Sequence, residues 1–186
     1  MSKTPTLPPG YTLRQGYPTV RDYIHLRSAS GLSPHSAAQA EAAMRGSWYG
    51  CYVTYNENPV QNGKDINLSG SNNTTSEELI VGMGRVIGDG GWYFHIADMA
   101  VLPDHQRKGL GDAILKDLMN RIRSLAPPPE KAEDGKLMGT YVSLFADVAG
   151  RKLYARNGFV DSMPHSMGMV QLLDKESTSH DGVSVS

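Results

Sequence analysis

The stretch QRKGLG, from Gln106 to Gly111, lies between a run typical of a β-strand and a run typical of an amphipathic helix. The first run, Trp92 to Leu102, contains aromatic and β-branched residues, and the second, Gly109 to Leu125, has apolar residues at steps of three and four. A helix that begins here presents free backbone N–H groups and the positive end of its dipole to an anion. Two glycines let the main chain approach a ligand closely, so the stretch predicts a phosphate-binding loop.

Two common nucleotide-binding loops are excluded by the same stretch. It lacks the Gly-Lys-Ser/Thr sequence of a P-loop. It also lacks Gly-x-Gly-x-x-Gly after a first strand, which disfavours a dinucleotide fold. The alternative interpretation is that this stretch is only the start of a helix, with exposed basic residues and no function.

Strands and helices alternate on both sides of this loop, which predicts an α/β (α+β) domain. A turn signal at residues 89–91 predicts that the strands within 79–102 form a hairpin, so part of the sheet is expected to be antiparallel. Strand, helix and strand from residue 92 to residue 145 indicate a parallel crossover in the other part. Further strands are expected at 11–14, 48–53 and 167–173, and further helices at 19–27, 33–44 and 148–156.

The chain of 186 residues has the length of one domain. We expect an extended lead-in over residues 1–10, one domain over 11–173, and a disordered tail over 174–186. Within the domain, residues 56–78 are polar and rich in Asn, Gly and Ser, and residues 126–138 follow a helix stopped by three prolines. Both segments are predicted to be flexible insertions.

Composition excludes several classes of protein. The formal net charge of −1 argues against a general nucleic-acid binder. Residues 1–10 lack the apolar stretch of a secretory signal, no apolar run is long enough to span a membrane, and Cys51 is the sole cysteine. We therefore expect no secretory leader, a cytoplasmic chain and no membrane partner. No metal is expected, and the sequence leaves a homodimer open.

Two motifs carry a family resemblance. The run from Asp98 to Gly111 resembles the acetyl-CoA-binding motif of GCN5-related N-acetyltransferases, and Leu153 to Phe159, LYARNGF, resembles the downstream helix–turn motif of the same family. They occur in the family's order, and the resemblance covers roughly residues 11–173. It implies a mixed, partly antiparallel central sheet flanked by helices, in which two central strands, from Trp92 and from Thr140, splay apart to admit the acetyl group.

The resemblance also implies how acetyl-CoA, the cosubstrate, is held. Loop amides would bind the pyrophosphate, and a strand edge would pair with the pantetheine arm. The cofactor-binding residues are then expected to be Met99, Ala100, Val101, Gln106, Arg107, Lys108, Gly109, Leu110 and Gly111.

The family's reaction is direct attack of an amine on the thioester, which requires a base and an acid. Tyr154 matches the family tyrosine that protonates the leaving sulfur. His95 and Asp98 are the candidates for the base. On an ideal strand their side chains point to opposite faces unless a bulge intervenes.

Other positions bear on the cofactor and the acceptor. Family members often have asparagine where this chain has Asp147, whose carboxylate cannot donate a hydrogen bond; it is a candidate helix cap. The small residues around Gly84 could leave room beside the cofactor. Polar or aromatic candidates for the acceptor site are Arg27, His35, Trp48 and Arg85.

Alternatives remain at this point. Cys51 could be the nucleophile of a covalent route, although no histidine adjoins it in sequence. The chain could be a non-catalytic acyl-CoA-binding module. A small-molecule amine is the expected acceptor, and a protein or peptide amine is the alternative.

Overall fold

The computed structural model describes residues 7–57 and 78–171 of the 186-residue chain. Residues 58–77, most of the predicted insertion at 56–78, and the predicted tail 174–186 lie outside the described residues. The chain divides into two compact units, Met1–Ala146 and Asp147–Ser186.

The first unit is built on a five-stranded sheet with the spatial order β1-β2-β3-β4-β7. Its strands are β1 (Tyr11–Gln15), β2 (Tyr49–Tyr55), β3 (Leu79–Gly88), β4 (Tyr93–Val101) and β7 (Tyr141–Leu144). The first four pair antiparallel, and β7 pairs parallel with β4. The predicted hairpin and the predicted parallel crossover are both confirmed, as is the mixed α/β class.

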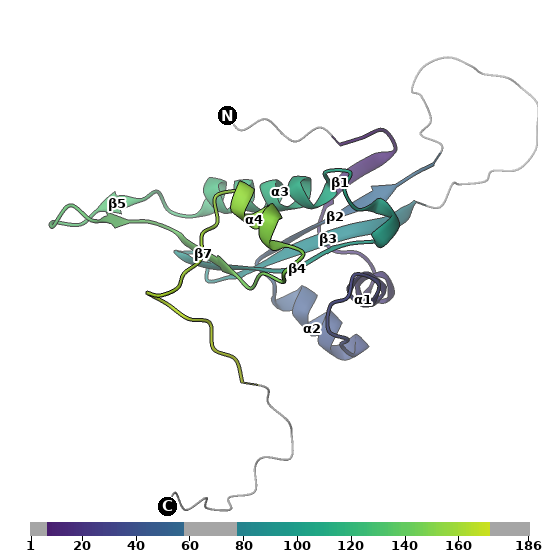
Figure 1. The fold of residues 1–186 in the computed structure, drawn as a ribbon, viewed down its shortest axis with the longest axis horizontal. Helices are drawn as coiled ribbons and strands as arrows, with labels where there is room; N and C mark the ends of the chain where they lie inside the picture. The colour runs from purple at the N-terminus through teal and green to yellow at the C-terminus, as the bar shows by residue number, and fades with distance from the viewer. Residues whose placement is uncertain (1–6, 58–77, 172–186) are drawn as a thin grey trace, which may run out of the picture. The chain divides into compact units, whose positions relative to one another are not determined.

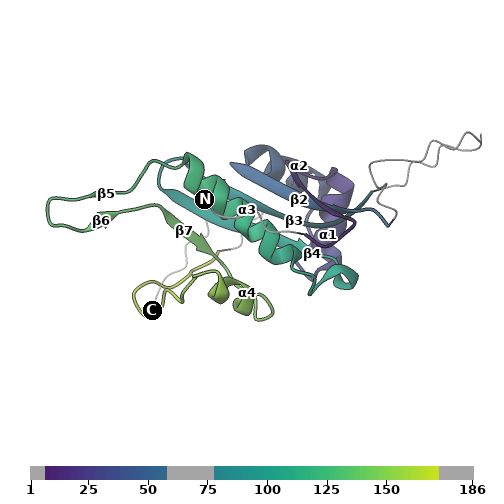
Figure 2. The ribbon, with the colours of Figure 1, turned by 90° about the horizontal axis from the view of Figure 1, so that it is seen from above.

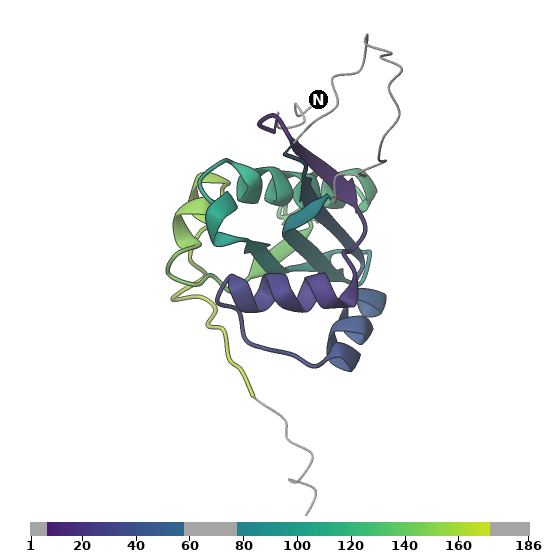
Figure 3. The same ribbon diagram turned by 90° about the vertical axis from the view of Figure 1, so that its right-hand side faces the viewer.

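Helices cover both faces of this sheet (Figure 1). One face packs against α1 (Val20–Ala29), and α2 (Ala37–Gly46) lies beside α1 on the same side (Figure 3). The other face packs against α3 (Leu110–Leu125), which runs along β2, β3 and β4 (Figure 2). The sheet therefore has an α1 face and an α3 face.

The apolar stripe of α3 forms the core on its face, as its periodicity predicts. Leu110, Ile114, Leu118 and Ile122 are buried, whereas Leu125 is exposed at the end of the helix. Burial of each such side chain contributes roughly 1.5–3 kcal/mol.

Gly84 makes this close packing of α3 against β3 possible. A Cβ at Gly84 would lie 2.7 Å from both Ile114 Cγ2 and Met99 Sδ. The space that the sequence suggested for a cofactor is therefore filled by the α3 core, because the glycine lets the helix approach the strand.

A β-bulge interrupts β4 in the middle of the sheet. Met83 pairs with Ala100 and Arg85 with Ala97, so two residues of β4 oppose the single residue Gly84 of β3. One of these two residues is Asp98, whose φ of 53° lies in the left-handed region. The pairing of β4 with β7 ends at Ile96 and Leu144, so β4 continues past the bulge without β7.

Several boundaries differ from the sequence expectation. The second helix begins after the cap Ser36, which forms a capping box with Gln39, and not at the expected Ser33. The segment 126–138 contains a short hairpin of β5 (Glu130–Lys131) and β6 (Leu137–Met138). The strand expected at 167–173 is not formed in residues 167–171, the part that is described. No helix in the described ranges is long and apolar enough to cross a membrane.

Candidate active site

The loop between β4 and α3 has a backbone conformation suited to an anion. β4 leads through the 3-10 turn η1 (Pro103–His105) into this loop. Arg107, with φ 60°, and Gly109, with φ 82°, are both left-handed. Alternation of left- and right-handed residues directs successive N–H groups to one side. The first bond of α3 runs from Ala113 N to Gly109 O (3.0 Å), so the N–H groups at the start of the helix have no intrahelical acceptor.

The basic side chains of this loop have different surroundings. Lys108 Nζ donates to Asp104 O at 3.0 Å and to Tyr11 OH at 3.1 Å, and Tyr11 OH lies 2.9 Å from His105 Nδ1. Lys108 therefore ties the loop to β1. Arg107 is exposed at the loop surface.

The remaining expected cofactor residues contribute mainly their main chain. The side-chain amide of Gln106 donates to Val101 O at 3.0 Å and so closes the loop against the end of β4. Ala100 and Leu110 are buried, so their side chains belong to the core. Gly111 lies in the first turn of α3. A ligand at this loop would meet backbone amides rather than these side chains.

The second half of β4 offers an open backbone edge. Leu102 N donates to Val81 O at 2.9 Å, so the backbone groups of Leu102 face β3. Because backbone groups alternate along a strand, those of Met99 and Val101 face the opposite way. β7 does not reach this part of β4. The edge expected to pair with pantetheine is therefore free of strand partners among the described residues.

Asp98 is the centre of a cluster of polar side chains on the α1 face. Its carboxylate accepts hydrogen bonds from Tyr23 OH and Arg27 Nη1, both of α1, and from Arg85 Nε of β3, the last at 2.5 Å. Burial alone would raise the pKa of Asp98, but hydrogen bonds from Tyr23 and Arg85 and the charges of Arg85 and Arg27 lower it. Burial, with the hydrogen bond and charge of Asp98, raises the pKa of Tyr23 to about 12. The cluster is thus a carboxylate held by a neutral phenol and two guanidinium groups.

The two arginines extend this cluster to the segment between the helices. Arg27 Nε and Nη2 donate to Ser33 O at 3.2 and 2.9 Å, and Arg85 Nη1 donates to Ser47 Oγ at 3.0 Å. The cluster therefore joins α1, the middle of the α1–α2 segment, the end of α2, β3 and β4. Two of the four residues expected at the acceptor site meet here.

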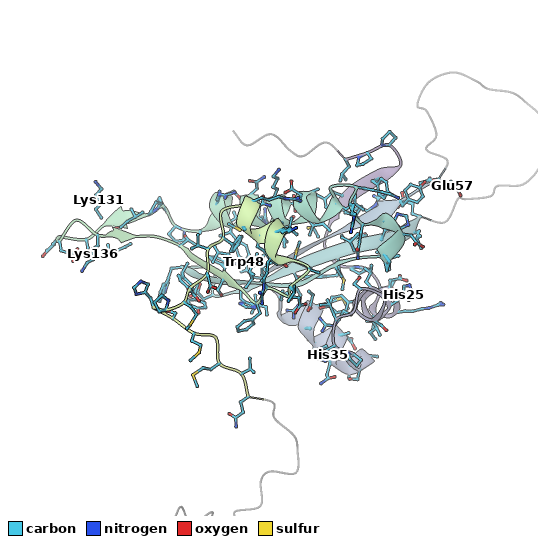
Figure 4. The ribbon with its side chains drawn as sticks, in the orientation of Figure 1. His25, His35, Trp48, Glu57, Lys131 and Lys136 are labelled. Carbon is cyan, nitrogen blue, oxygen red and sulfur yellow. The ribbon has the colours of Figure 1, made fainter. Side chains whose placement is uncertain are left out.

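The other two expected acceptor residues lie elsewhere. His35 is exposed on the segment just before α2 (Figure 4). The ring of Trp48 packs edge-on against Phe94 with 4.8 Å between centroids. Trp48 is therefore a packing residue.

His95 lies on the same face as Asp98. Partners in an antiparallel pair share a face, and His95 and Ala97 are partnered by Ile87 and Arg85, which are two residues apart. The carboxylate of Asp98 contacts Arg85 on that face. The opposite orientation expected of an ideal strand is thus wrong, because the bulge inserts an extra residue between the two side chains.

The imidazole of His95 is half-buried between β4 and β7. Its Nδ1 lies 3.0 Å from Ser143 Oγ, and its ring centroid lies 5.3 Å from that of Phe145. Burial and the charge of Arg85 lower the pKa of His95, and the charge of Asp98 opposes them only in part. The ring is therefore neutral at pH 7 and able to accept a proton.

The second unit carries Tyr154 on the short helix α4 (Arg151–Arg156). The Tyr154 ring makes an edge contact with Phe159 at 6.0 Å between centroids. Burial and the charge of Asp147 raise the pKa of Tyr154, so its phenol remains protonated at neutral pH. Gly158, with φ 88°, lies just beyond the helix end, as its sequence predicts.

Asp147 is not the cap of α4, as the sequence suggested, but begins the turn that precedes this helix. Its carbonyl oxygen accepts from Gly150 N at 2.9 Å and from Arg151 N at 3.2 Å. The cap residue of α4 is Gly150, which has no side chain to contribute. The start expected at residue 148 is three residues too early, because these residues form the turn that precedes the helix.

Cys51 lies in the core of the first unit. Its side chain is buried, and Sγ contacts the carbonyl oxygen of Ile114 on the α3 face at 3.9 Å. Burial, reinforced by the nearby carboxylate of Asp117, raises the pKa of the thiol. Such a thiol does not ionise at neutral pH and is a poor nucleophile.

Sequence reasoning missed Tyr23 and Ser143 as members of this region. Tyr23 and Arg27 are one helical turn apart on α1, a spacing that places both on one face. Nothing in the sequence links them to Asp98, which is more than 70 residues away. Ser143 could be linked to His95 only through the register of β4 and β7.

Known acetyltransferases resemble this chain in sequence and in fold. Residues 73–161 match the family model described as acetyltransferase (GNAT) domain. No curated protein sequence matches the chain.

Three solved structures illustrate the likeness of fold. A probable acetyltransferase of unknown function from meticillin-resistant Staphylococcus aureus is 29% identical, with a TM-score of 0.67 over 88% of this chain and 99% of that one. A GNAT family acetyltransferase from Streptococcus pneumoniae is 18% identical, with a TM-score of 0.58 over 89% and 99%. Glucosamine-6-phosphate N-acetyltransferase from Arabidopsis thaliana is 16% identical, with a TM-score of 0.51 over 88% and 99%.

Proposed function

The chain belongs to the GCN5-related N-acetyltransferase (GNAT) superfamily, and on that premise we propose that it transfers the acetyl group of acetyl-CoA to the nitrogen of a primary amine. One observation supports this proposal most strongly. The bulged strand β4 has a backbone edge at Met99 that no strand pairs in the described residues, and it leads through η1 into the loop with left-handed Arg107 and Gly109 just before α3. A long ligand that carries a diphosphate at one end and an amide-rich arm at the other fits this succession.

The residues present fit the cosubstrate. The N–H groups of the loop around the left-handed residues Arg107 and Gly109, with those of Leu110 and Gly111 at the start of α3, would hold the diphosphate. The backbone groups of Met99 and the N–H of Val101 would pair with the pantetheine arm, whereas the carbonyl oxygen of Val101 already accepts from Gln106 and Ser30. When bound, acetyl-CoA supplies an activated acyl group and a thiolate leaving group.

His95 is the proposed base. A primary amine has a pKa near ~10.4 and is mostly protonated at neutral pH, so a group must take its proton before attack. The neutral imidazole of His95 has this capacity, directly or through a water molecule. Asp98 is less suited, since its carboxylate is engaged by three donors and its pKa is lowered. We assign Asp98 the role of holding the bulge in place.

Tyr154 is the proposed acid, on the strength of the motif from Leu153 to Phe159. A phenol that is protonated at neutral pH can give its proton to the sulfur as the thiolate leaves. The nitrogen loses two protons on the way from ammonium to amide, the first to His95 before attack and the second as the amide forms. The sulfur gains one proton, from Tyr154, which is reprotonated in turn. The net result is one proton released to solvent. Cys51 has no part in this route.

Thiol release from acetyl-CoA, measured against a panel of primary amines, tests the proposed function. We expect release that depends on the amine and a fall in kcat of ~10²–10⁴-fold in Tyr154→Phe, because a positioned general acid contributes about that factor. The affinity for acetyl-CoA should stay similar. Tyr141→Phe is the matched control, since Tyr141 is an exposed tyrosine stacked on Tyr93. Unchanged turnover in Tyr154→Phe would remove this tyrosine from the mechanism.

Binding of acetyl-CoA without transfer to any amine would support the alternative of a non-catalytic binding module. Transfer to peptide amines alone would support a protein acceptor.

A further inference from the structure

The cluster around Asp98 contains more positive than negative charge. In the described part of the chain, Arg27 and Arg85 each form an ion pair with Asp98 and with no other carboxylate. Tyr23, the other partner of Asp98, is neutral. The exposed fractions of the three charged side chains are 9%, 14% and 11% for Arg27, Arg85 and Asp98. Charges withdrawn from water to this extent are normally paired. The excess is one positive charge.

The donors of Arg27 are directed into the protein. Nε and Nη2 donate to Ser33 O, and Nη1 donates to Asp98. Arg27 is therefore bound on all three nitrogens by residues of the chain. The excess charge is more accessible at the other guanidinium group.

Arg85 has one nitrogen that reaches solvent. Its Nε donates to Asp98 and Tyr23, and its Nη1 donates to Ser47 Oγ. Nη2 donates to no described residue, yet no buried side-chain nitrogen or oxygen in the described ranges is without a partner. Nη2 is therefore accessible, while the rest of the guanidinium is fixed by three hydrogen bonds. A planar cation held in this way is preorganised to bind an anionic oxygen.

The accessible nitrogen lies on the same face as the proposed base. Arg85 pairs with Ala97, two residues from His95, and its charge acts on the His95 ring. The small side chain of Ala97 separates the two. An amine whose nitrogen faces His95 would bring a neighbouring substituent toward Arg85.

We propose that Arg85 is a specificity-determining residue and that the acceptor is a primary amine carrying an anionic group, a carboxylate or a phosphate, which Arg85 binds. This inference rests on the proposed function and adds the chemical class of the acceptor. The anion balances the excess charge of the cluster and places the amine beside His95. A polyamine would instead bring a second positive charge to a site that already has one in excess, which is unfavourable.

Matched pairs of amines test the proposal without changing the protein. We would compare phosphoethanolamine with ethanolamine, and β-alanine with β-alaninamide, and include spermidine as a cationic amine. A hydrogen bond to a charged group predicts a kcat/KM about 10- to 100-fold higher for the anionic member of one pair. A higher kcat/KM for phosphoethanolamine than for ethanolamine would identify the anionic group as a phosphate. A higher kcat/KM for β-alanine than for β-alaninamide would identify it as a carboxylate.

Equal rates for both members of each pair, or a preference for spermidine, would overturn this inference and leave the proposed function standing. No transfer to any amine would overturn both.

Substitution of Arg85 tests the assignment to this side chain. Arg85→Gln should remove the preference by raising KM for the anionic amine about 10-fold or more, while KM for its neutral partner changes little. Arg85→Lys keeps the charge without the planar fork and should retain only part of the preference. It also keeps a cation beside Asp98 if Arg85→Gln proves unstable. Arg14→Gln, which breaks the exposed ion pair of Arg14 with Glu78, is the control and should leave the preference intact. A preference that survives in folded Arg85→Gln and Arg85→Lys would overturn the role of Arg85.

Discussion

The two halves of the candidate site, the side-chain cluster at the bulge in β4 and the loop that follows β4, are built in different ways. The loop from Gln106 to Gly111 offers mainly backbone amides from six consecutive residues, and much of it is exposed. The cluster around Asp98 offers side chains from α1, β3 and β4, and it is mostly buried. A loop of the first kind tolerates changes of side chain but not of backbone conformation. A cluster of the second kind depends on each member, because loss of one leaves the others unpaired.

The largest effect is expected on the side-chain half. His95→Gln should lower kcat by ~10²–10⁴-fold, because it removes the proposed base. His25→Gln, at an exposed histidine of α1 (Figure 4), is the control and should change nothing.

The pH profile sharpens this prediction. The base must be neutral, and the pKa of His95 is lowered from 6.5, so kcat/KM of the native protein should fall only as pH drops below about 6.5. This fall of kcat/KM at acidic pH, the acidic limb of the profile, should be absent from His95→Gln. A limb that persists in the variant would assign the base to another group.

The next largest effect concerns stability. Asp98→Ala should lower the free energy of unfolding by about 3–5 kcal/mol, because it leaves two largely buried guanidinium groups without a counter-charge. Denaturant titration measures this change. Glu41→Gln, which removes the exposed pair of Glu41 with Arg45, is the control and should cost less than about 1 kcal/mol. Equal losses of unfolding free energy in Asp98→Ala and Glu41→Gln would show that the Asp98 cluster does not stabilise the sheet.

The stability that Asp98 contributes should also depend on pH. Because its pKa is depressed in the folded state, the contribution is fully present above the unfolded pKa near ~3.9. It is lost as pH falls further, through the folded pKa. The difference in stability between the native protein and Asp98→Ala should therefore shrink below about pH 4.

The smallest effect is expected on the main-chain half. Gly109→Ala introduces no clash, since a Cβ there meets no atom within 4 Å, but φ of 82° costs a residue with a side chain roughly 1–2 kcal/mol. The loop should relax, and KM for acetyl-CoA should rise about 10-fold while kcat changes little. Gly46→Ala is the matched control, since its Cβ also meets no atom and its φ is not positive. A rise in KM for the amine alone would contradict the division into two halves.

The same contrast explains what could be predicted from sequence. The loop and α3 were predictable because their signals are local: a strand, two glycines and one apolar stripe within about 30 residues. The capping box of Ser36 and Gln39 is also a local signal, and it determines where α2 starts in place of the expected Ser33.

The side-chain half could not be predicted in this way. The bulge at Asp98 follows from the register of β4 against β3, which single-strand alternation does not contain. The contacts of Asp98 with Tyr23 and Arg27 join residues 75 and 71 positions apart. The sequence named Asp98, His95, Arg27 and Arg85 as separate candidates, and only the fold brings them to one face.

The most direct test of the central claim follows the acetyl group itself. The protein is incubated with acetyl-CoA labelled in its acetyl group and a mixture of primary amines, and mass spectrometry locates the label. The account predicts label in an amide of one amine, equimolar with free CoA thiol, and none on the protein. Label on Cys51, or label that remains in bound acetyl-CoA while every amine stays unmodified, would contradict it.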